Sequence, residues 1–162
     1  MANAGPSGDV GRLFGADGAV QRVRPAAYAW CEQDGALLLC RVASRGPLGG
    51  QWTLPGGGLR FGEDPLDALL REVGEETGLS VEPGEVLGVR SAMLEPGETV
   101  SGHRIQALGI VYRCRVTGGR LRDEADGSTD LARWLPWPEV ARLATTPLLR
   151  WALDTVRSVG AW

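Results

Sequence analysis

The sequence predicts a single-domain α/β or α+β sandwich, and three observations support this fold class. The chain has 162 residues, a length that suits one domain with a sizeable hydrophobic core. Apolar residues make up 43% of the chain and charged residues 23%, which is ordinary for a soluble globular protein. Short strand-like runs alternate with helical patterns, and we find no internal repeat and no second domain.

The N-terminal residues 1–24 are rich in Gly, Ala and polar residues, so we predict a flexible arm with one short turn or strand around 11–14. The domain is then expected to occupy residues 25–160. Residues 26–32 and 36–43 predict two strands joined by a hairpin at Asp34-Gly35. A loop follows at 44–51, because this segment holds three glycines and a proline.

The segment from Gly57 to Leu79 contains the strongest helix signals. Asp64 can cap a helix whose first residue is Pro65, where the missing N–H is not needed. Gly78 is placed to end that helix in the left-handed conformation. An apolar stripe at helical spacing is expected to face the core: Leu66, Leu69, Leu70 and Val73.

The second half of the chain predicts further elements in the same alternating order. Expected strands lie at 85–94, 104–116 and 131–137, with loops at 95–102 and 120–130 and a turn at Gly118-Gly119. Two helices are expected at about 137–144 and 147–157. This order of strands and helices gives the layered sandwich.

Three glutamates of the expected central helix share one face. Glu72, Glu75 and Glu76 stand at i, i+3 and i+4, so their carboxylates are expected to converge. Each like-charge pair at i, i+4 destabilises a helix by roughly 0.2–0.5 kcal/mol, and Gly74 in the interior costs roughly 1 kcal/mol more relative to Ala. Divalent cations remove this conflict, because carboxylate oxygens are hard ligands that suit Mg²⁺ or Mn²⁺. Taken alone, the three glutamates also fit a solvated acidic face.

The whole segment resembles a complete Nudix box. The matching positions are Gly57, Glu63, Arg71, Glu72, Val73, Glu75, Glu76, Gly78 and Leu79. The preceding run 52–58 (WTLPGGG) is similar to the family's entry into the box. The resemblance implies an α/β/α sandwich around a mixed sheet. It also implies a Nudix hydrolase that cleaves the pyrophosphate of a nucleoside diphosphate linked to another group, with ADP-ribose or another nucleotide sugar favoured.

The resemblance also implies roles for the box residues. The metals, Mg²⁺ or alternatively Mn²⁺, are expected on Glu72, Glu75 and Glu76, which also help to activate water. By position, Arg71 orients the acidic cluster, while Glu63 braces the loop or lies near a metal. The carbonyl of Gly56 is a further expected ligand. Many family members have an acid where this chain has Arg60, which either favours an anionic substrate or faces solvent.

Residues outside the box are weaker candidates for substrate binding. Arg45 lies in the loop that flanks the substrate in relatives and could reach a phosphate, although the favoured interpretation is an exposed arginine without a partner. Trp52 could stack on a base or pack in the core. His103 lies where a loop meets a strand, either as an ordinary strand-end residue or as a substrate contact. Glu124 and Asp130 lie in an acidic loop where relatives place a further metal ligand or base.

Two other functions stay open at this point. One is a pyrophosphohydrolase that converts normal or oxidised nucleoside triphosphates to the monophosphate and pyrophosphate. The other is a nucleotide sensor without catalysis, although such proteins often have a degraded box and this box is intact. The expected partner is a small nucleoside diphosphate derivative, and homodimers are frequent among relatives.

Charge and cysteine content exclude several classes of protein. A net charge of −3 gives no footprint for stable nucleic-acid binding. No stretch approaches the length of a membrane span, and the N-terminus lacks the pattern of a signal peptide. Cys31, Cys40 and Cys114 lack metal-ligand spacing, so we expect reduced core thiols in a cytoplasmic protein.

Overall fold

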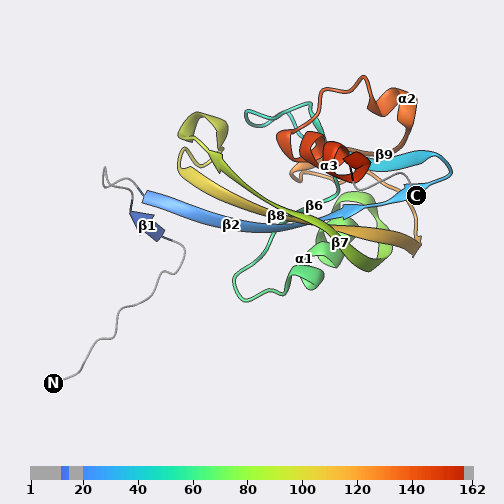
Figure 1. The fold of residues 1–162 in the computed structure, drawn as a ribbon, viewed down its shortest axis with the longest axis horizontal. Coiled ribbons are helices and arrows are strands. Elements are labelled where there is room, and N and C mark those ends of the chain that lie inside the picture. Colours follow the sequence, from blue (N-terminus) through green and yellow to red (C-terminus); the bar gives the residue numbers. More distant parts are fainter. Residues whose placement is uncertain (1–11, 15–19, 159–162) are drawn as a thin grey trace.

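The computed structural model describes residues 12–14 and 20–158, and Figure 1 shows the arrangement of its elements. The strands are β1 (Arg12–Phe14), β2 (Val20–Trp30), β3 (Glu32–Gln33), β4 (Ala36–Val42), β5 (Trp52–Thr53), β6 (Gly56–Gly58), β7 (Leu79–Leu94), β8 (Arg104–Gly119) and β9 (Thr129–Pro136). The helices are α1 (Pro65–Thr77), α2 (Trp137–Val140) and α3 (Pro147–Ser158), with a short 3₁₀ turn η1 (Pro96–Glu98). This mixture of strands and helices confirms the predicted fold class.

The strands form two sheets. The larger sheet has the order β1-β2-β8-β7, with β6 paired to β2 as well. The smaller sheet has the order β3-β4-β5, with β9 paired to β4. The long β2–β8 pair is parallel and its neighbours are antiparallel, so the larger sheet is mixed, as the resemblance implied.

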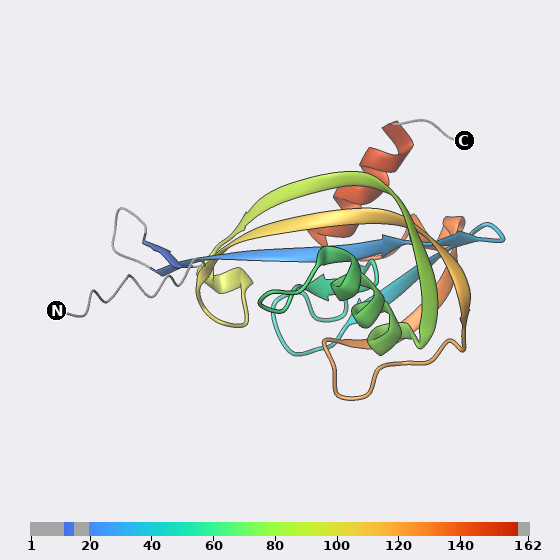
Figure 2. The same ribbon diagram turned by 90° about the horizontal axis from the view of Figure 1, so that it is seen from below.

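The helices cover opposite sides of the larger sheet. Helix α1 packs against β2, β6, β7 and β9, whereas α3 packs against β5 and β7. Figure 2 shows α1 on one side of β2, β8 and β7 and α3 on the other. Helix α2 lies against β4 and β9. The layers therefore have the α/β/α order that the resemblance implied.

Two buried apolar clusters fill the spaces between these layers. The cluster under α1 consists of Ala27, Ala29, Cys31, Leu38, Leu69, Val73, Leu79, Val81 and Cys114. The cluster under α2 and α3 consists of Trp30, Leu37, Leu39, Leu54, Val111, Val140, Leu149 and Ala152. Successive residues of β2 contribute to opposite clusters, because side chains alternate between the two faces of a strand.

The ends of α1 lie where the sequence predicts them. The Asp64 carboxylate accepts a hydrogen bond from the Leu66 N–H at 2.9 Å, and Pro65 is the first helical residue. At the other end, Gly78 has a φ of 73° and its N–H bonds to the Gly74 carbonyl. The cap residues thus set the length of the helix that carries the glutamates.

The buried face of α1 differs from the predicted apolar stripe. Leu66 and Leu70 are 41% and 43% exposed, so their expected burial is wrong. The buried residues are instead Ala68, Leu69, Val73, Glu76 and Thr77. The helix is rotated so that positions 69, 73 and 76 face the sheet, which places Glu76 inside the protein and both leucines on the flanks.

Strand boundaries also required corrections. Strand β2 begins at Val20, so residues 20–24 belong to the domain, although the sequence suggested an arm up to residue 24. The predicted short strand near 11–14 is confirmed by β1, whereas residues 1–11, 15–19 and 159–162 lie outside the described chain. The hairpin is confirmed at Asp34 and Gly35, which have φ angles of 50° and 76°.

Two elements start or stop earlier than the sequence suggested. Strand β7 starts at Leu79, directly after the helix cap, rather than at residue 85. Helix α2 stops at Val140 rather than near residue 144. The chain after α2 pairs with β5 instead, since the Trp52 N–H donates to the Ala144 carbonyl at 2.8 Å and Thr145 bridges Trp52. Tertiary pairing overrides helix propensity there. No helix in the described part of the chain has both the length and the apolar character that crossing a bilayer requires.

Candidate functional site

The glycine strand β6 brings the backbone up to the carboxylates of α1. Gly56 has a φ of 139°, and a Cβ atom there would lie 2.2 Å from the Ala27 carbonyl oxygen. A Cβ on Gly57 would lie 2.8 Å from the Glu72 carboxylate carbon. Glycine is therefore required at both positions for β6 to fit between β2 and α1.

Glu76 is the buried acid of the site, with only 1% of its surface exposed. Its Oε2 accepts a hydrogen bond from the Gly56 N–H at 2.9 Å, and its Oε1 accepts one from the Ser128 hydroxyl at 3.3 Å. Burial, with smaller contributions from the carboxylates of Glu72 and Glu124, raises the pKa of Glu76 to about 8, although the hydrogen bonds from Gly56 and Ser128 oppose the rise. Ionisation of Glu76 therefore needs an additional positive charge nearby.

Arg71 joins the other acids of the box. Its guanidinium donates to both oxygens of Glu63, at 2.7 and 2.8 Å, and to Glu72 at 2.8 Å. It also reaches Glu75 at 3.3 Å and the Gly58 carbonyl at 3.2 Å. One cation thus fixes the loop before α1, the strand β6 and two helix glutamates relative to one another.

Glu63 is bound tightly to Arg71. The hydrogen bonds from Arg71, with a further one from the Arg60 N–H at 2.8 Å, lower the pKa of Glu63 to about 2. Both carboxylate oxygens are engaged in this way, which fits the bracing role better than metal ligation. The Arg60 side chain itself is exposed and lies 3.6 Å from Glu75.

The three helix glutamates do not converge as the spacing suggested. Glu72 and Glu75 turn toward Arg71, whereas Glu76 points inward to Gly56. Within the described ranges, no three Asp, Glu, His or Cys side chains are arranged so as to enclose a metal ion. The donor chemistry still fits Mg²⁺ or Mn²⁺, because Glu72 and Glu124 lie close enough to raise the pKa of Glu76 and all three supply hard carboxylate oxygens.

The loop before β9 adds a fourth carboxylate. Glu124 Oε2 accepts hydrogen bonds from the Thr129 N–H and hydroxyl, at 3.4 and 3.1 Å. Gly127 makes room for this arrangement, since a Cβ there would lie 1.8 Å from the Glu124 carboxylate carbon. Glu124 is close enough to Glu76 to raise the pKa of Glu76. Glu124 therefore belongs to the site, although it is 48 or more residues away from every helix glutamate in the sequence.

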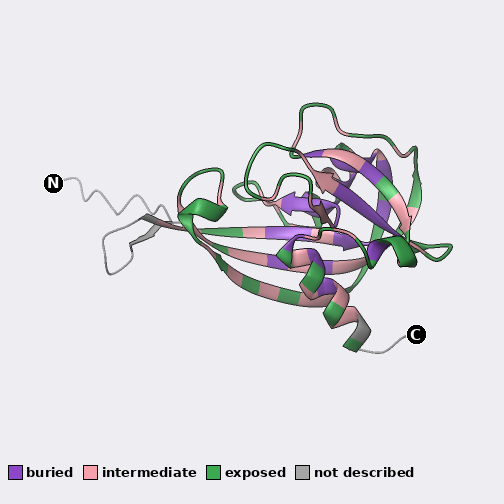
Figure 3. Cartoon of the chain, turned by 90° about the horizontal axis from the view of Figure 1, so that it is seen from above, coloured by how far each residue is buried: buried purple, intermediate pink, exposed green. Residues whose placement is uncertain are grey.

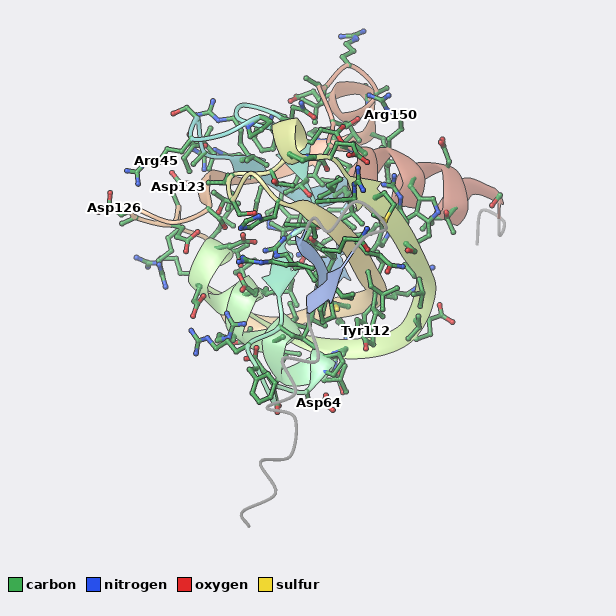
Figure 4. All side chains as sticks on the ribbon, turned by 90° about the vertical axis from the view of Figure 1, so that its left-hand side faces the viewer. Arg45, Asp64, Tyr112, Asp123, Asp126 and Arg150 are labelled. Atoms are coloured by element: carbon green, nitrogen blue, oxygen red, sulfur yellow. The ribbon has the colours of Figure 1, made fainter. Side chains whose placement is uncertain are left out.

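The remaining sequence candidates lie in other surroundings. Asp130 forms a two-bond ion pair with Arg41, at 2.8 and 3.1 Å. Trp52 packs against the apolar cluster under α3. The His103 carbonyl accepts a hydrogen bond from Thr99 at 2.8 Å. Arg45 is exposed and points away from the body of the protein, as does Asp126 (Figure 4).

Some site residues gave no signal in the sequence. Ser128 is 52 positions from Glu76, and only the fold brings its hydroxyl to the carboxylate. The sequence pattern points to the Gly56 carbonyl as a ligand and gives no signal for its N–H, which binds Glu76. Tyr28 is half-buried beside Gly56, and the loss of solvent around its hydroxyl raises its pKa, with the Arg24 cation opposing the rise. Alternation along β2 could have placed Tyr28 inside but not beside the glutamates.

All three cysteines are buried and free. Cys40 lies on β4 close to the site, and burial raises the pKa of its thiol well above the ordinary value, with Glu76 adding to the rise. A thiol in this state is protonated at neutral pH and behaves as a small apolar side chain. The prediction of core thiols is confirmed.

Comparison with known proteins gives the family. The NUDIX domain family model matches residues 21–154. A MutT-like protein of Streptomyces ambofaciens is 35% identical over 129 residues, which cover 79% of this chain and 73% of that protein. The nucleoside triphosphatase NudI of Escherichia fergusonii is 54% identical over 58 residues, covering 35% of this chain and 41% of NudI. The crystal structure of a MutT NUDIX hydrolase from Burkholderia pseudomallei is 26% identical, with a TM-score of 0.67, and the match covers 83% of this chain and 98% of that one.

Proposed function

Because the chain belongs to the NUDIX family of hydrolases, we propose that it cleaves the pyrophosphate bond of a nucleoside diphosphate linked to another group. ADP-ribose or another nucleotide sugar is the favoured substrate class. The observation that carries the reaction class is the buried Glu76, whose ionisation is opposed by Glu72 and Glu124. Such a site favours binding of a divalent cation. The cation is needed because a pyrophosphate substrate would otherwise be repelled by the four nearby acids.

Mg²⁺ is the proposed cofactor, with Mn²⁺ as the alternative. Glu72, Glu75, Glu76 and Glu124 would hold it, because their oxygens are the hard donors at this place. When bound, the metal neutralises phosphate charge and makes a bound water more acidic. The chain's own contribution is to fix these carboxylates, through Arg71 from one side and through Gly56 and Ser128 from the other.

A proton acceptor for the attacking water is also present. Glu124 uses only its Oε2 for the hydrogen bonds to Thr129, and its Oε1 has no partner among the described residues. A helix glutamate is the other candidate base, since Glu75 is bound by Arg71 through a long contact of 3.3 Å and stays partly exposed. We place the reaction in the cytoplasm, in keeping with the buried free thiols.

A second candidate function has its own support. The segment that matches NudI at 54% identity suggests hydrolysis of a nucleoside triphosphate to the monophosphate and pyrophosphate. The two functions share the metal site and differ in the group that leaves. Product identity therefore separates them.

A hydrolysis screen with product identification tests both functions. Purified protein with Mg²⁺ or Mn²⁺ is given ADP-ribose, other nucleoside diphosphate sugars, and normal and oxidised nucleoside triphosphates. Chromatography identifies the products, with Glu76→Gln as the inactive variant and Asp67→Asn, an exposed acid on the same helix, as the matched control. Two phosphorylated halves of a linked substrate support the main proposal, and monophosphate with pyrophosphate supports the second. Cleavage that persists in Glu76→Gln contradicts both.

A further inference from the structure

Three arginines lie on the face of the larger sheet that α3 covers in part. Strand β2 pairs with β8 without a register shift, so Arg22 and Arg24 face the same side as Tyr28, which packs under α3. On β7, a Cβ on Gly88 would lie 2.9 Å from the Trp151 ring of α3, so Arg90, two residues further along, also faces this side. Sheet register therefore places all three cations on one surface.

Small residues of β2, β8 and β7 lie between these arginines. Rows of paired residues across β2, β8 and β7 run Arg24-Ala107-Ala92 and Ala26-Gly109-Arg90. Arg24 and Arg90 are two strand spacings apart across the sheet, about 10 Å, and two residues apart along it, about 7 Å, so their Cα atoms lie roughly 12 Å apart. Figure 3 shows that the sheet extends beyond α3 and that strand residues there are exposed or intermediate. Ala26 and Gly109 are buried, with Leu148 of α3 over Gly109, whereas Ala107 and Ala92 are half-buried. A substrate group can therefore lie along the row Arg24-Ala107-Ala92, beside Arg90.

Within residues 20–158, none of the three arginines is paired with an acid. Arg22, Arg24 and Arg90 have no hydrogen bond or ion pair with other described residues. Most other arginines of the described chain do have acidic partners: Arg41, Arg60, Arg71, Arg104, Arg113, Arg115 and Arg133. Like charges gathered on one sheet face repel one another. An anionic ligand would remove that repulsion, and guanidinium groups bind phosphate oxygens in pairs.

This face adjoins the candidate metal site through Gly58. A Cβ on Gly58 would lie 3.0 Å from Arg24 Nε, so the Arg24 side chain passes directly over β6. On the same glycine, the carbonyl accepts a hydrogen bond from Arg71 at 3.2 Å. A substrate whose pyrophosphate sits at Glu72 and Glu76 could therefore extend across Gly58 onto the arginine face.

We propose that Arg22, Arg24 and Arg90 bind a second anionic group, a phosphate monoester, on the part of the substrate that does not react. This inference rests on the proposed function and narrows its substrate class. It names linked nucleoside diphosphates that carry an additional phosphate. The arginines act on substrate selection, and the carboxylates of α1 act on the reacting pyrophosphate.

Substrate pairs that differ by one phosphate test the proposal. Two pairs are suitable: NADPH with NADH, and coenzyme A with dephospho-coenzyme A. The members of each pair differ by one phosphate monoester. A hydrogen bond to a charged group contributes about 1.5–3 kcal/mol, so kcat/KM is expected to favour the phosphorylated member by roughly 10-fold or more. Arg24→Gln and Arg90→Gln are expected to abolish this ratio, Arg24→Lys to keep part of it, and Arg142→Gln, an exposed arginine after α2, to leave it unchanged.

Binding without turnover separates this proposal from the proposed function. Calorimetry compares adenosine 2′,5′-bisphosphate with 5′-AMP on the wild-type protein and on the same variants. Tighter binding of the bisphosphate that disappears in Arg24→Gln supports the arginine face, even if no compound is hydrolysed. Equal wild-type kcat/KM and equal affinity within each pair would overturn it. The proposal would also be overturned if Arg24→Gln lowered kcat/KM and affinity equally for both members of each pair, because Arg24 would then hold the reacting pyrophosphate.

Discussion

Glu76 differs from its neighbours Glu72 and Glu75 in burial rather than in chemistry. It is 1% exposed and points to Gly56, whereas the half-buried Glu72 and the exposed Glu75 both bind Arg71. A pKa raised to about 8 means that the acid is largely protonated at neutral pH in the absence of a cation. An acid of this kind is close in shape to a glutamine, whose carbonyl oxygen can accept one of the two hydrogen bonds that Glu76 accepts.

Glu76→Gln is therefore expected to fold normally and to lose activity. The amide oxygen can accept the hydrogen bond from the Gly56 N–H, so the melting temperature should stay within a few degrees of wild type. The amide cannot supply negative charge to a cation, so kcat should fall by roughly 100-fold or more. Steady-state kinetics at saturating Mg²⁺, with Asp67→Asn alongside, measure the effect. Turnover near the wild-type rate would remove Glu76 from the mechanism.

Glu63 and Arg71 should make stability depend on pH in acid. The hydrogen bonds from Arg71 lower the pKa of Glu63 from an ordinary 4.5 to about 2. A lowered folded-state pKa stabilises the fold fully above the unfolded value and loses that effect as pH falls. The contribution should thus be complete above about pH 4.5 and lost progressively toward pH 2.

Urea unfolding at pH 5, 4 and 3 checks this dependence with a Glu63→Gln variant. The variant should be less stable than wild type at pH 5, and the difference should narrow as pH falls to 3. Asp67→Asn, an exposed acid outside the Arg71 network, should follow the wild-type curve more closely. A constant difference between Glu63→Gln and wild type at all three pH values would show that the ion pair does not titrate in this range.

Helix α1 has a glycine that its packing does not require. Nothing lies within 4 Å of a Cβ placed on Gly74, and its backbone is helical. Gly74→Ala should therefore raise the free energy of unfolding by about 0.5–1 kcal/mol, through lower entropy of the unfolded chain and better helix propensity. Chemical denaturation measures this, and kcat should be unchanged. Destabilisation would show that this helix needs glycine for a reason other than space.

Strand β6, unlike position 74 of α1, requires glycine at position 56. Gly56→Ala would place a Cβ 2.2 Å from the Ala27 carbonyl oxygen at a φ of 139°. The backbone would have to shift away from Glu76, so both stability and activity should fall, with at least about 1–3 kcal/mol lost from the free energy of unfolding. Gly97→Ala is the matched control, because its Cβ meets nothing and its φ is not positive. A neutral Gly56→Ala variant would contradict this account of β6.

Local signals in the sequence predicted where the elements begin and end better than they predicted which residues are buried. The capping residue Asp64, the terminating Gly78 and the turn at Asp34-Gly35 act through their own backbone, so they could be read directly. The rotation of α1 about its axis could not be predicted from the sequence, because contacts with β2, β6, β7 and β9 decide which side of the helix faces inward. Apolar periodicity favoured Leu66 and Leu70, and tertiary packing favoured Glu76.

At the scale of the whole molecule, the site combines segments that only the fold brings together. The box residues from Gly57 to Leu79 were predictable, since they are contiguous and their pattern is dense. Glu124 and Ser128 come from the loop before β9; Glu124 was a candidate only through the family resemblance, and nothing in the local sequence points Ser128 to Glu76. The arginines of the α3 face likewise share a surface only because of the register of β2, β8 and β7.

The two faces of the larger sheet have separate tasks in this arrangement. The α1 face carries the carboxylates that face Gly57, and the α3 face carries the unpaired arginines that adjoin Gly58. Consecutive glycines of β6 alternate between these faces, so one short strand connects the metal site with the arginine face. Substitutions on the α3 face should therefore change substrate preference more than metal dependence.

Calorimetric titration of Mn²⁺ into the protein tests the central claim, a cation site built on Glu76. Wild-type protein and Asp67→Asn should bind Mn²⁺ with the same affinity. Glu76→Gln should bind it at least about 10-fold more weakly while keeping its circular dichroism spectrum, because a buried ligand is lost and the fold is not. Mn²⁺ binding of equal strength in Glu76→Gln and wild type would contradict the claim.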